Sequence, residues 1–522
     1  MNSNDTLINR HVALLSLGSI AVLCGCSTNE RQMPEKPNIV FILADDMGYG
    51  DVSALNEESK LMTGNIDRIA AEGIVFTDAH TCSSVSTPSR YGLLTGRYNW
   101  RSELKEGVLD GYSAPLIKSG RRTVAQMLKE SGYATACIGK WHLGWNWKNI
   151  EQGRDSVDFS QPITDGPTTR GFDYFYGIAA SLDMAPYVYL ENDSVTALPD
   201  RMTVNKGKFT WWREGPTGAD FVHEQVLPNL TDKAVDYIKN HANGKQPFFL
   251  YFPLPAPHTP ILPTEEFLGK SGLNPYGDFV LMVDDVVGKV MAALDECGIS
   301  GNTILVFSTD NGCSPEADFE ELGAKGHDPS YIFRGYKSDL FDGGHRVPCM
   351  LRWPDRVKRH TVSQTVSLTD FYATFASIAG CQIKDCEAED SYDMTPLLLQ
   401  EDEATIVREA TVSHSIEGEF TIRKGRWKLL LSPSSGGWSY PAPGRDDSVI
   451  ATLPPVQLYD MIADPEEEHN LCSESPEIVK ELTELMIRYV KEGRSTPGTP
   501  QKNDGPEVWE QLRWIEEYGN PR

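Results

Sequence analysis

Three short apolar runs constrain the fold of this chain more than any other feature. They cover residues 37–44 (PNIVFILA), 246–252 (QPFFLYF) and 303–308 (TILVFS), and none of them contains a charged residue. Continuous apolar runs of this length, rich in β-branched and aromatic residues, are typical of strands buried on both faces of a parallel sheet. The helical segments expected between them are 123–130, 227–240 and 278–296. This alternation predicts an α/β fold in which a large, mostly parallel central sheet is flanked by helices on both sides.

The sequence changes in character after about residue 400. Residues 420–431 (FTIRKGRWKLLL) are expected to form a hairpin with Lys424 and Gly425 at its turn, and residues 456–461 to add a strand. An amphipathic helix is predicted at 478–492. Strands followed by one helix indicate a smaller C-terminal α+β subdomain.

Two segments near the C-terminus are expected to lie outside the core of that subdomain. Residues 432–455 are rich in proline and glycine, and we interpret them as an excursion from the small sheet. From residue 496 onward the tail is polar with two tryptophans. We expect this tail to be draped over the surface.

Residues 1–26 are typical of the leader of an exported lipoprotein. The apolar run at 12–23 is shorter than the ~20 residues that span a bilayer, and it matches the core of a secretory signal. The sequence Leu-Cys-Gly-Cys at 23–26 resembles a bacterial lipobox, which would make Cys26 the lipidated first residue, followed by a tether at 27–36. We therefore expect a periplasmic or outer-membrane, cell-surface protein of a Gram-negative bacterium, held to the membrane only by its lipid anchor. The alternative is an ordinary cleaved signal peptide with a chance cysteine.

Charge and cysteine content bear on the partners and on disulfide bonding. The formal net charge is -26, with 48 Lys and Arg against 74 Asp and Glu. Binding to nucleic acid requires a concentrated basic face, so a nucleic-acid partner is not expected. An anionic substrate would have to meet its few basic residues in a single pocket. Cys381 and Cys386 could close a small disulfide loop, but free thiols fit equally well.

Acidic residues follow two of the predicted strands. The first apolar run ends in Asp45 and Asp46, and the third runs into Asp310 and Asn311. Ligands bind beyond the carboxyl ends of strands in open α/β sheets, so these two ends can meet. Three carboxylates and an amide oxygen suit a hard cation, calcium before magnesium, and the absence of His and Cys counts against zinc. Either pair alone would be ordinary turn residues, but together they favour a metal site.

The stretch at 83–97 (SSVSTPSRYGLLTGR) gathers small hydroxyl residues, a proline and two arginines. Pro88 suits the first turn of a helix, which would place Ser86 at the helix N-terminus, where backbone N–H groups favour an anion. Arg90 lies one turn further on and can reach the same place. No G-x-S-x-G motif occurs in the chain, so a conventional serine hydrolase is not indicated. The alternative is a simple cap followed by a surface helix.

These residues resemble a known family. Ser-Thr-Pro-Ser-Arg at 86–90, continuing to Leu-Thr-Gly-Arg at 94–97, is similar to the first signature of the type I sulfatases of the alkaline-phosphatase superfamily. Gly-Tyr-Ala-Thr at 132–135, leading to Gly-Lys-Trp-His-Leu-Gly at 139–144, resembles the second. The resemblance runs from about residue 37 to 498. It implies an alkaline-phosphatase-like fold, a catalytic domain at 37–400, and a C-terminal subdomain and tail at 401–522.

The resemblance also implies the nucleophile and the metal. The family uses formylglycine (3-oxoalanine), which here would be made from Ser86, since Cys82 stands at the wrong offset from the proline and arginine. A serine at this position resembles the bacterial form that an anaerobic sulfatase-maturating radical-SAM enzyme converts. One Ca²⁺ would be bound by Asp45, Asp46, Asp310 and Asn311.

The remaining catalytic roles follow from the same resemblance. Arg90 and Lys140 would stabilise the hydrated aldehyde, and His142 would be the base that regenerates it. Lys337 would bind a sulfate oxygen, and His258 would bind sulfate and protonate the leaving oxygen. Taken alone, a histidine flanked by prolines such as His258 is usually structural, and Lys337 could be a surface lysine.

Four residues are predicted to bind substrate: Ser181, which matches a family serine near the hydrated aldehyde, and Asp183, His345 and His414, which are expected to contact the sugar of a sulfated glycan. Asp and His side chains hydrogen-bond sugar hydroxyls, while their alternative roles are a turn cap and surface histidines. Asp342 and His345 also depart from the usual family pattern beside the Gly-Gly turn. The surroundings of Ser181 and of that turn resemble galactose- and N-acetylgalactosamine-directed sulfatases.

The predicted activity is therefore exo-acting removal of sulfate from galactose or N-acetylgalactosamine in host or algal glycans. Two alternatives remain open from the sequence. One is a phosphodiester or phosphonate hydrolase of the same superfamily. The other is a glycan-binding lipoprotein in which Ser86 is never converted.

Overall fold

The structure, a computed structural model, describes residues 36–151, 156–400 and 405–518. These residues belong to one compact unit that begins at Lys36. The expected leader at 1–26 and almost all of the expected tether lie outside the described residues. The expected domain boundary at 400 adjoins residues 401–404, which also lie outside them.

The large sheet is built around the first apolar run. That run forms β1 (Asn38–Ala44), which pairs in parallel with β10 (Phe248–Pro253) on one side and with β11 (Thr303–Thr309) on the other. Beyond β10, β4 (Ala134–Lys140) and β5 (Tyr174–Ile178) continue the parallel arrangement. All three predicted strands are therefore confirmed, and they are neighbours.

Five outer strands complete this ten-stranded sheet, whose order is β13-β2-β12-β11-β1-β10-β4-β5-β6-β7. They are β12 (Cys349–Arg352), β2 (Ile74–Phe76), β13 (His360–Val362), β6 (Leu190–Glu191) and β7 (Ser194–Val195). They pair antiparallel except β13, which pairs in parallel with β2, and β13 and β7 are the two edge strands. The predicted fold class, a large and mostly parallel sheet, is confirmed.

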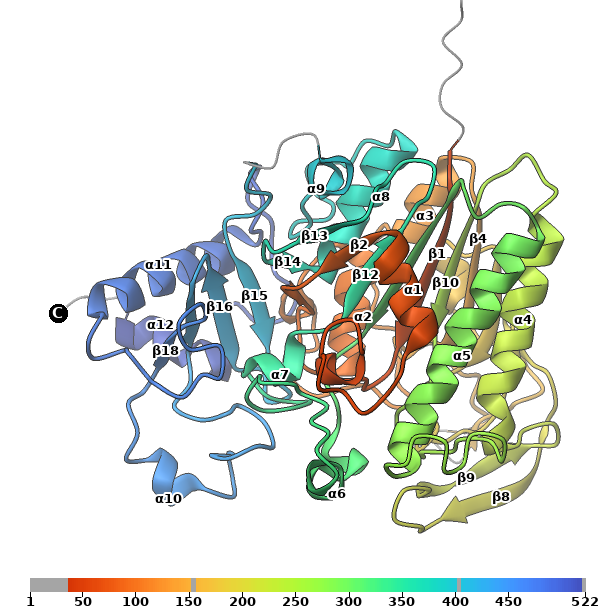
Figure 1. The fold of residues 1–522 in the computed structure, drawn as a ribbon, viewed down its shortest axis with the longest axis horizontal. Coiled ribbons are helices and arrows are strands. Elements are labelled where there is room, and N and C mark those ends of the chain that lie inside the picture. The colour runs from red at the N-terminus through yellow and green to blue at the C-terminus, as the bar shows by residue number, and fades with distance from the viewer. Residues whose placement is uncertain (1–35, 152–155, 401–404, 519–522) are drawn as a thin grey trace, which may run out of the picture. The chain divides into compact units, whose positions relative to one another are not determined.

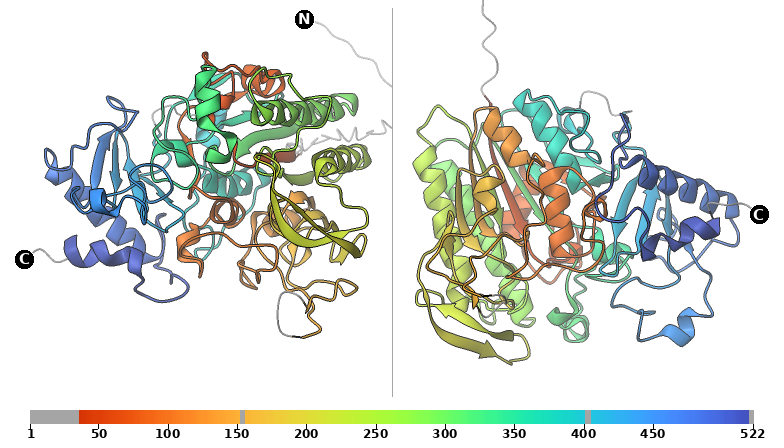
Figure 2. Two further views of the ribbon diagram at one scale, coloured as in Figure 1. Left: turned by 90° about the horizontal axis from the view of Figure 1, so that it is seen from below. Right: turned by 180° about the vertical axis from the view of Figure 1, so that it is seen from behind.

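Helices cover both faces of the sheet because alternate residues of β1 point to opposite sides. Val40 and Ile42 pack into one hydrophobic core, whereas Ile39 and Phe41 pack into another. Helices of the first core are α1 (Gly64–Glu72), α4 (Val226–His241) and α5 (Pro275–Glu296); those of the second are α2 (Ser86–Thr95), α3 (Val124–Glu130) and α8 (Phe371–Ala379). Figure 1 shows α1, α4 and α5 in front of the sheet, and the view from behind in Figure 2 shows α3 on the other face.

The C-terminal part has a core of its own, made by a four-stranded antiparallel sheet and one long helix. Its elements are β15 (Thr411–His414), β16 (Phe420–Lys424), β17 (Trp427–Leu430), β18 (Gln457–Asp460) and α11 (Pro476–Glu492). They confirm the predicted hairpin, the added strand and the helix. The blue elements of Figure 1 show this sheet with α11 packed on it.

The expectation of a surface tail was right for residues 497–500 and 505–508, which are exposed, but wrong for the two tryptophans. Trp509 and Trp514 are only 9% and 3% exposed and pack with Leu512 into the C-terminal core. Large aromatic side chains bury more apolar area than any other type, so a mostly polar segment with two of them still gains by docking. The tail ends in α12 (Arg513–Tyr518).

Shorter elements connect these layers. They are a two-stranded ribbon of β8 (Pro199–Asn205) and β9 (Trp212–Gly218), a pair of β3 (Ala79–His80) and β14 (Val366–Ser367), and the helices α6 (Phe319–Ala324), α7 (Asp342–His345), α9 (Thr395–Leu399) and α10 (Asp447–Ile450). Cys381 and Cys386 are both free thiols. In the described part of the chain, no helix is both long and apolar enough to cross a membrane.

Candidate active site

Acidic residues from two strand ends meet at the carboxyl edge of the sheet, as the pattern of apolar runs predicts. The backbone N–H of Asp46 donates to Asp310 Oδ1 at 3.3 Å, and Asn311 Nδ2 donates to Asp46 Oδ1 at 2.7 Å. Asp45, Asp46, Asp310 and Asn311 are all buried. The adjacent parallel strands β1 and β11 bring these residues together, although about 265 positions separate them in the chain.

Each of the three carboxylates is paired with a buried cation. Lys140 Nζ lies 2.6 Å from Asp45 Oδ2, and Lys337 Nζ lies 2.7 Å from Asp46 Oδ2. The Arg90 guanidinium donates to Asp310 through Nε at 3.0 Å and through a terminal nitrogen at 2.7 Å. The cluster therefore contains three acids and three bases, which balance in charge.

These pairs keep the acids ionised despite their burial. Burial raises the pKa of the Asp45 carboxyl, but Lys140, His258 and Arg90 outweigh it and lower that pKa to about 2. Burial also raises the pKa of Asp46, but Lys337 and His258 outweigh it, so that the pKa of this carboxyl lies below its ordinary value. Ionised carboxylates are the form that binds a metal ion.

The donor set fits a hard divalent cation. Asn311 Oδ1 is buried and has no hydrogen-bond partner among the described residues, so this acceptor is available to a cation. The other donors are carboxylate oxygens, although a nitrogen of His258 lies within 4.8 Å of oxygens from Asp45 and Asp46. Because the cluster is already neutral, a bound dication would leave it positive and suited to an anionic substrate.

Ser86 lies against this cluster at the start of α2, as predicted for the helix N-terminus. Its Oγ donates to Asp45 Oδ1 at 3.3 Å, and Lys140 Nζ lies 3.5 Å from the same Oγ. The hydroxyl is buried, and Arg90 on the same helix reaches Asp310 across the cluster. The helix start, two cations and the acids thus converge on one hydroxyl.

His142 follows β4 in a left-handed backbone conformation with φ of 55°. Its Nε2 donates to the carbonyl of Leu109 at 2.7 Å, whereas Nδ1 is buried without a hydrogen-bond partner in the described part of the chain. Burial, with Lys140 and Arg90 nearby, holds the pKa of His142 well below its ordinary value. The ring is therefore neutral, and the Nδ1 lone pair is free to accept a proton.

His258 lies in the loop after β10, next to Asp46. Its Nδ1 donates to the carbonyl of Thr259 at 2.5 Å, which leaves Nε2 facing Asp46 Oδ2 at 3.6 Å. Its Nδ1 also lies 4.0 Å from Asp183 Oδ1. The ring is thus fixed by the loop after β10, with its second nitrogen turned toward the acids.

Ser181 and Asp183 follow β5, which places them beside this loop. Ser181 Oγ is buried without a partner among the described residues. Asp183 pairs with Arg213, which comes from β9. Sequence reasoning did not single out Arg213; the segment Trp-Trp-Arg at 211–213 was the available signal, because aromatic and basic residues often gather at sugar-binding sites.

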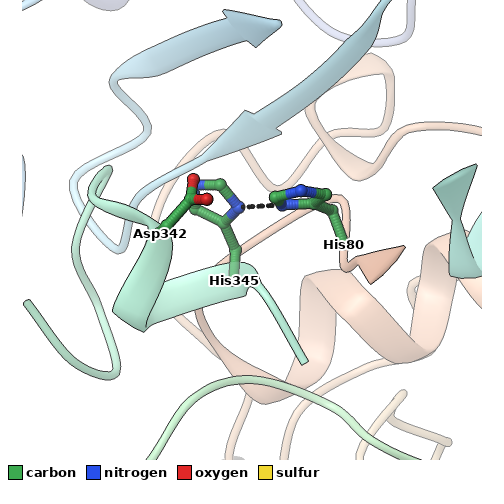
Figure 3. A group of neighbouring side chains, drawn as sticks. All are labelled: His80, Asp342 and His345. Atoms are coloured by element: carbon green, nitrogen blue, oxygen red, sulfur yellow. Dashed lines mark hydrogen bonds and ion pairs between the residues drawn. The ribbon is translucent and has the colours of Figure 1, made fainter. Parts of the chain in front are cut away.

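The structure does not bring His345 to this site. As Figure 3 shows, His345 faces His80, and their Nδ1 atoms are 2.9 Å apart. His345 Nε2 donates to the carbonyl of Leu340 at 2.9 Å, so both ring nitrogens are engaged. Asp342, beside it, bonds Lys428 of β17 at 2.7 Å. This buried cluster joins α7 to the C-terminal sheet. Its side chains form hydrogen bonds and ion pairs with one another and with nearby residues of the protein.

His414 lies next to the segment that leads to Ser86. Its backbone N–H donates to the Cys82 carbonyl at 3.1 Å, and its carbonyl accepts from the N–H of Ser84 at 3.0 Å. Its side chain is buried with Nδ1 donating to the Ser415 carbonyl, and burial lowers its pKa to about 4. These contacts place His414 beside the chain entering α2 rather than beside Asp183.

Comparisons with known proteins agree with this geometry. The profile of the Sulfatase family matches residues 37–381. An N-acetylgalactosamine-6-O-sulfatase of Bacteroides thetaiotaomicron is 36% identical over 518 residues, covering 90% of this chain and 97% of the relative. Human arylsulfatase A is 31% identical over 469 residues, with 86% and 87% covered.

Solved structures show the same fold. One, from work on the metabolism of multiple glycosaminoglycans by Bacteroides thetaiotaomicron, has a TM-score of 0.77 at 35% identity and covers 87% of this chain and 99% of that one. A phosphonate monoester hydrolase of Agrobacterium radiobacter has a TM-score of 0.56 at 17% identity, covering 87% and 95%. At that identity the second likeness concerns the fold alone.

Proposed function

The chain belongs to the sulfatase family and is a sulfuric ester hydrolase, and we propose that it removes sulfate from carbohydrates. The substrate class we propose is galactose or N-acetylgalactosamine that carries sulfate at the end of a host or algal glycan, so that the enzyme is exo-acting. Support comes from the Bacteroides thetaiotaomicron relative, which is an N-acetylgalactosamine-6-O-sulfatase.

The position of Ser86 carries this proposal. Its hydroxyl lies between Asp45 and Lys140, and none of its hydrogen bonds in the described structure is to a histidine that could activate it as an ordinary serine nucleophile. We propose that an anaerobic radical-SAM maturation enzyme converts it to formylglycine. In hydrated form that group would supply one hydroxyl to attack sulfur and a second whose proton loss releases sulfate by C–O cleavage.

Asp45, Asp46, Asp310 and Asn311 would hold one Ca²⁺, whose charge would stabilise negative charge on the sulfate. Lys140 and Arg90 fix the acids next to residue 86 and add positive charge there. Lys337, only 8% exposed, extends the positive charge to the side where Asp46 and His258 lie. Preorganised charge of this kind is the largest contribution to many group transfers.

Two histidines would move the protons. The Nδ1–H of His258 is hydrogen-bonded to the Thr259 carbonyl, so Nε2 is the position at which the ring would have to carry a second proton in order to protonate the leaving sugar oxygen. His142 is neutral and has a free Nδ1, so it can accept the proton whose loss releases sulfate. The two rings stand in different electrostatic surroundings, which suits an acid and a base.

We also propose that the chain is exported and anchored through a lipid on Cys26. The support is the leader sequence at 1–26. Metabolic labelling with a radioactive fatty acid tests this proposal: wild type should be labelled, and Cys26→Ser should be unlabelled and released from the membrane fraction.

The experiment for the function is sulfate release measured with and without co-expression of the maturation enzyme. The co-expressed protein should release sulfate from N-acetylgalactosamine 6-sulfate or galactose 6-sulfate, whereas protein made without the enzyme should be folded and nearly inactive. A preference for phosphonate monoesters or phosphodiesters would favour the alternative hydrolase. Sugar binding without turnover, with Ser86 still unconverted after co-expression with the maturation enzyme, would favour the alternative of a glycan-binding lipoprotein.

A further inference from the structure

Arg213 and Asp183 form a pair at the side of the site where the sugar must lie. Arg213 comes from β9, and its guanidinium is paired with Asp183 Oδ2. Asp183 Oδ1 lies 4.0 Å from Nδ1 of His258, whose other ring nitrogen faces the acids around the nucleophile. Asp183 therefore lies beside His258, the residue proposed to protonate the leaving oxygen.

The segment that carries Arg213 is anchored on three sides of the site. The Phe209 carbonyl accepts from the N–H of Ile261, in the loop that holds His258, at 2.7 Å. Trp211 Nε1 donates to Glu316 at 2.9 Å, shortly after the metal-binding loop of β11. The backbone N–H of Arg213 donates to the Asp183 carbonyl at 3.2 Å. These three hydrogen bonds hold the segment at 209–213 against the loops that follow β5, β10 and β11.

The pair has hydrogen-bonding capacity left over. Asp183 is only 3% exposed, yet its Oδ1 has no hydrogen-bond partner among the described residues. The Arg213 side chain is 55% exposed and bonds Asp183 through one terminal nitrogen, and its other nitrogens make no hydrogen bond to the described residues. A buried acceptor without a partner is costly, whereas an exposed ion pair by itself contributes little to stability.

We propose that Arg213 and Asp183 together bind a hydroxyl group of the sulfated sugar and determine which sugar is accepted. Asp183 Oδ1 accepts the hydroxyl proton, and the free nitrogens of Arg213 donate to the hydroxyl oxygen. The Trp211 ring, whose centroid is 5.3 Å from the guanidinium carbon, positions Arg213 for this contact. This assignment rests on the proposed function, because it needs a sugar at the leaving-group side.

The test compares two kinds of sulfate ester in the mature enzyme. Arg213→Ala and Asp183→Asn are assayed for kcat/KM on N-acetylgalactosamine 6-sulfate and on an aryl sulfate, which has no sugar hydroxyls. Glu214→Ala is the matched control, since Glu214 is exposed and is the next residue on the same strand. Inhibition by free N-acetylgalactosamine is measured in parallel, because it reports sugar binding without chemistry.

Both variants should lower kcat/KM for the sugar sulfate by roughly 10- to 100-fold and weaken inhibition by N-acetylgalactosamine. Arg213→Ala should hydrolyse the aryl sulfate as wild type does, and Glu214→Ala should match wild type on both esters. An equal loss on both esters for Arg213→Ala, or unchanged values for the sugar and for its inhibition, would overturn the assignment. If the wild-type mature enzyme released no sulfate from any ester, the proposed function itself would be wrong.

Discussion

Lys428 Nζ lies 2.7 Å from Asp342 Oδ1, so a strand of the C-terminal sheet neutralises an acid of α7. The same Nζ lies 2.7 Å from Glu467, which accepts the backbone N–H of Asp342 at 2.7 Å. All three side chains are almost fully buried. The C-terminal part is thereby tied to the short helix that follows the loop bearing Lys337.

Replacing Lys428 with Met should therefore destabilise the whole protein. The variant removes the Lys428 cation from buried Glu467. Asp342, in contrast, keeps Arg346 at 3.3 Å and Arg423 at 3.8 Å. Breaking a buried pair from one side costs about 3–5 kcal/mol, and we expect a loss near the lower end of that range. Urea denaturation followed by fluorescence measures the free energy of unfolding. The triple variant Lys428→Met, Asp342→Asn, Glu467→Gln should recover part of that loss. A change below about 1 kcal/mol in the single variant would show that the pairs are not what joins the two parts.

Asp339 should make stability depend on pH. It accepts the N–H groups of Tyr336 and Trp438 at 3.0 and 2.8 Å, but burial raises its pKa to about 6. Because the folded state holds this proton more tightly than the unfolded state, its stabilisation is present below pH 4 and is lost as pH rises through 6. Relative to Asp339→Asn, wild type should lose about 2 kcal/mol of unfolding free energy between pH 4 and pH 7. Parallel pH profiles for the two proteins would contradict this.

Calcium should raise the thermal stability of the protein as well as its activity. A cation that binds only the folded state stabilises it by mass action, and Asn311 Oδ1 offers it an otherwise unpartnered acceptor. Calorimetry with added Ca²⁺ or chelator should show a Tm that rises with Ca²⁺ for wild type and a much weaker rise for Asn311→Ala. A Tm independent of Ca²⁺, or a requirement for Zn²⁺, would contradict the site.

His345→Gln should leave sugar preference unchanged. The ring is enclosed by His80 and the Leu340 carbonyl, and neither ring nitrogen is free for a substrate. We expect lower thermal stability with the ratio of kcat/KM for galactose and glucosamine sulfates as in wild type. A changed ratio would return His345 to the substrate-binding residues predicted from the sequence.

The clustering of Asp45, Asp46, Asp310 and Asn311 could be predicted from the sequence because it depends on local patterns. Asp45 and Asp310 each follow a charge-free run, and parallel strands present such residues at one edge. Ser86 was placed at a helix start by the proline two residues on. In each case the position of the residue in its own element was sufficient.

The contacts of Asp183 with Arg213 and of His345 with His80 could not be predicted from such local patterns. Arg213 reaches Asp183 only because a ribbon thirty residues away folds back over the loop after β5. The His80 ring that occupies His345 lies 265 positions away in the chain. Neither contact leaves a periodic or spaced signal, because both depend on how separate elements pack.

The mass of the peptide that contains Ser86 tests the central claim most directly. Trypsin should release residues 69–90, which end at Arg90. In protein co-expressed with the maturation enzyme, this peptide should be lighter by two hydrogen atoms, and the converted fraction should rise in proportion to sulfatase activity. Fully active protein in which residue 86 is still an unmodified serine would contradict the account.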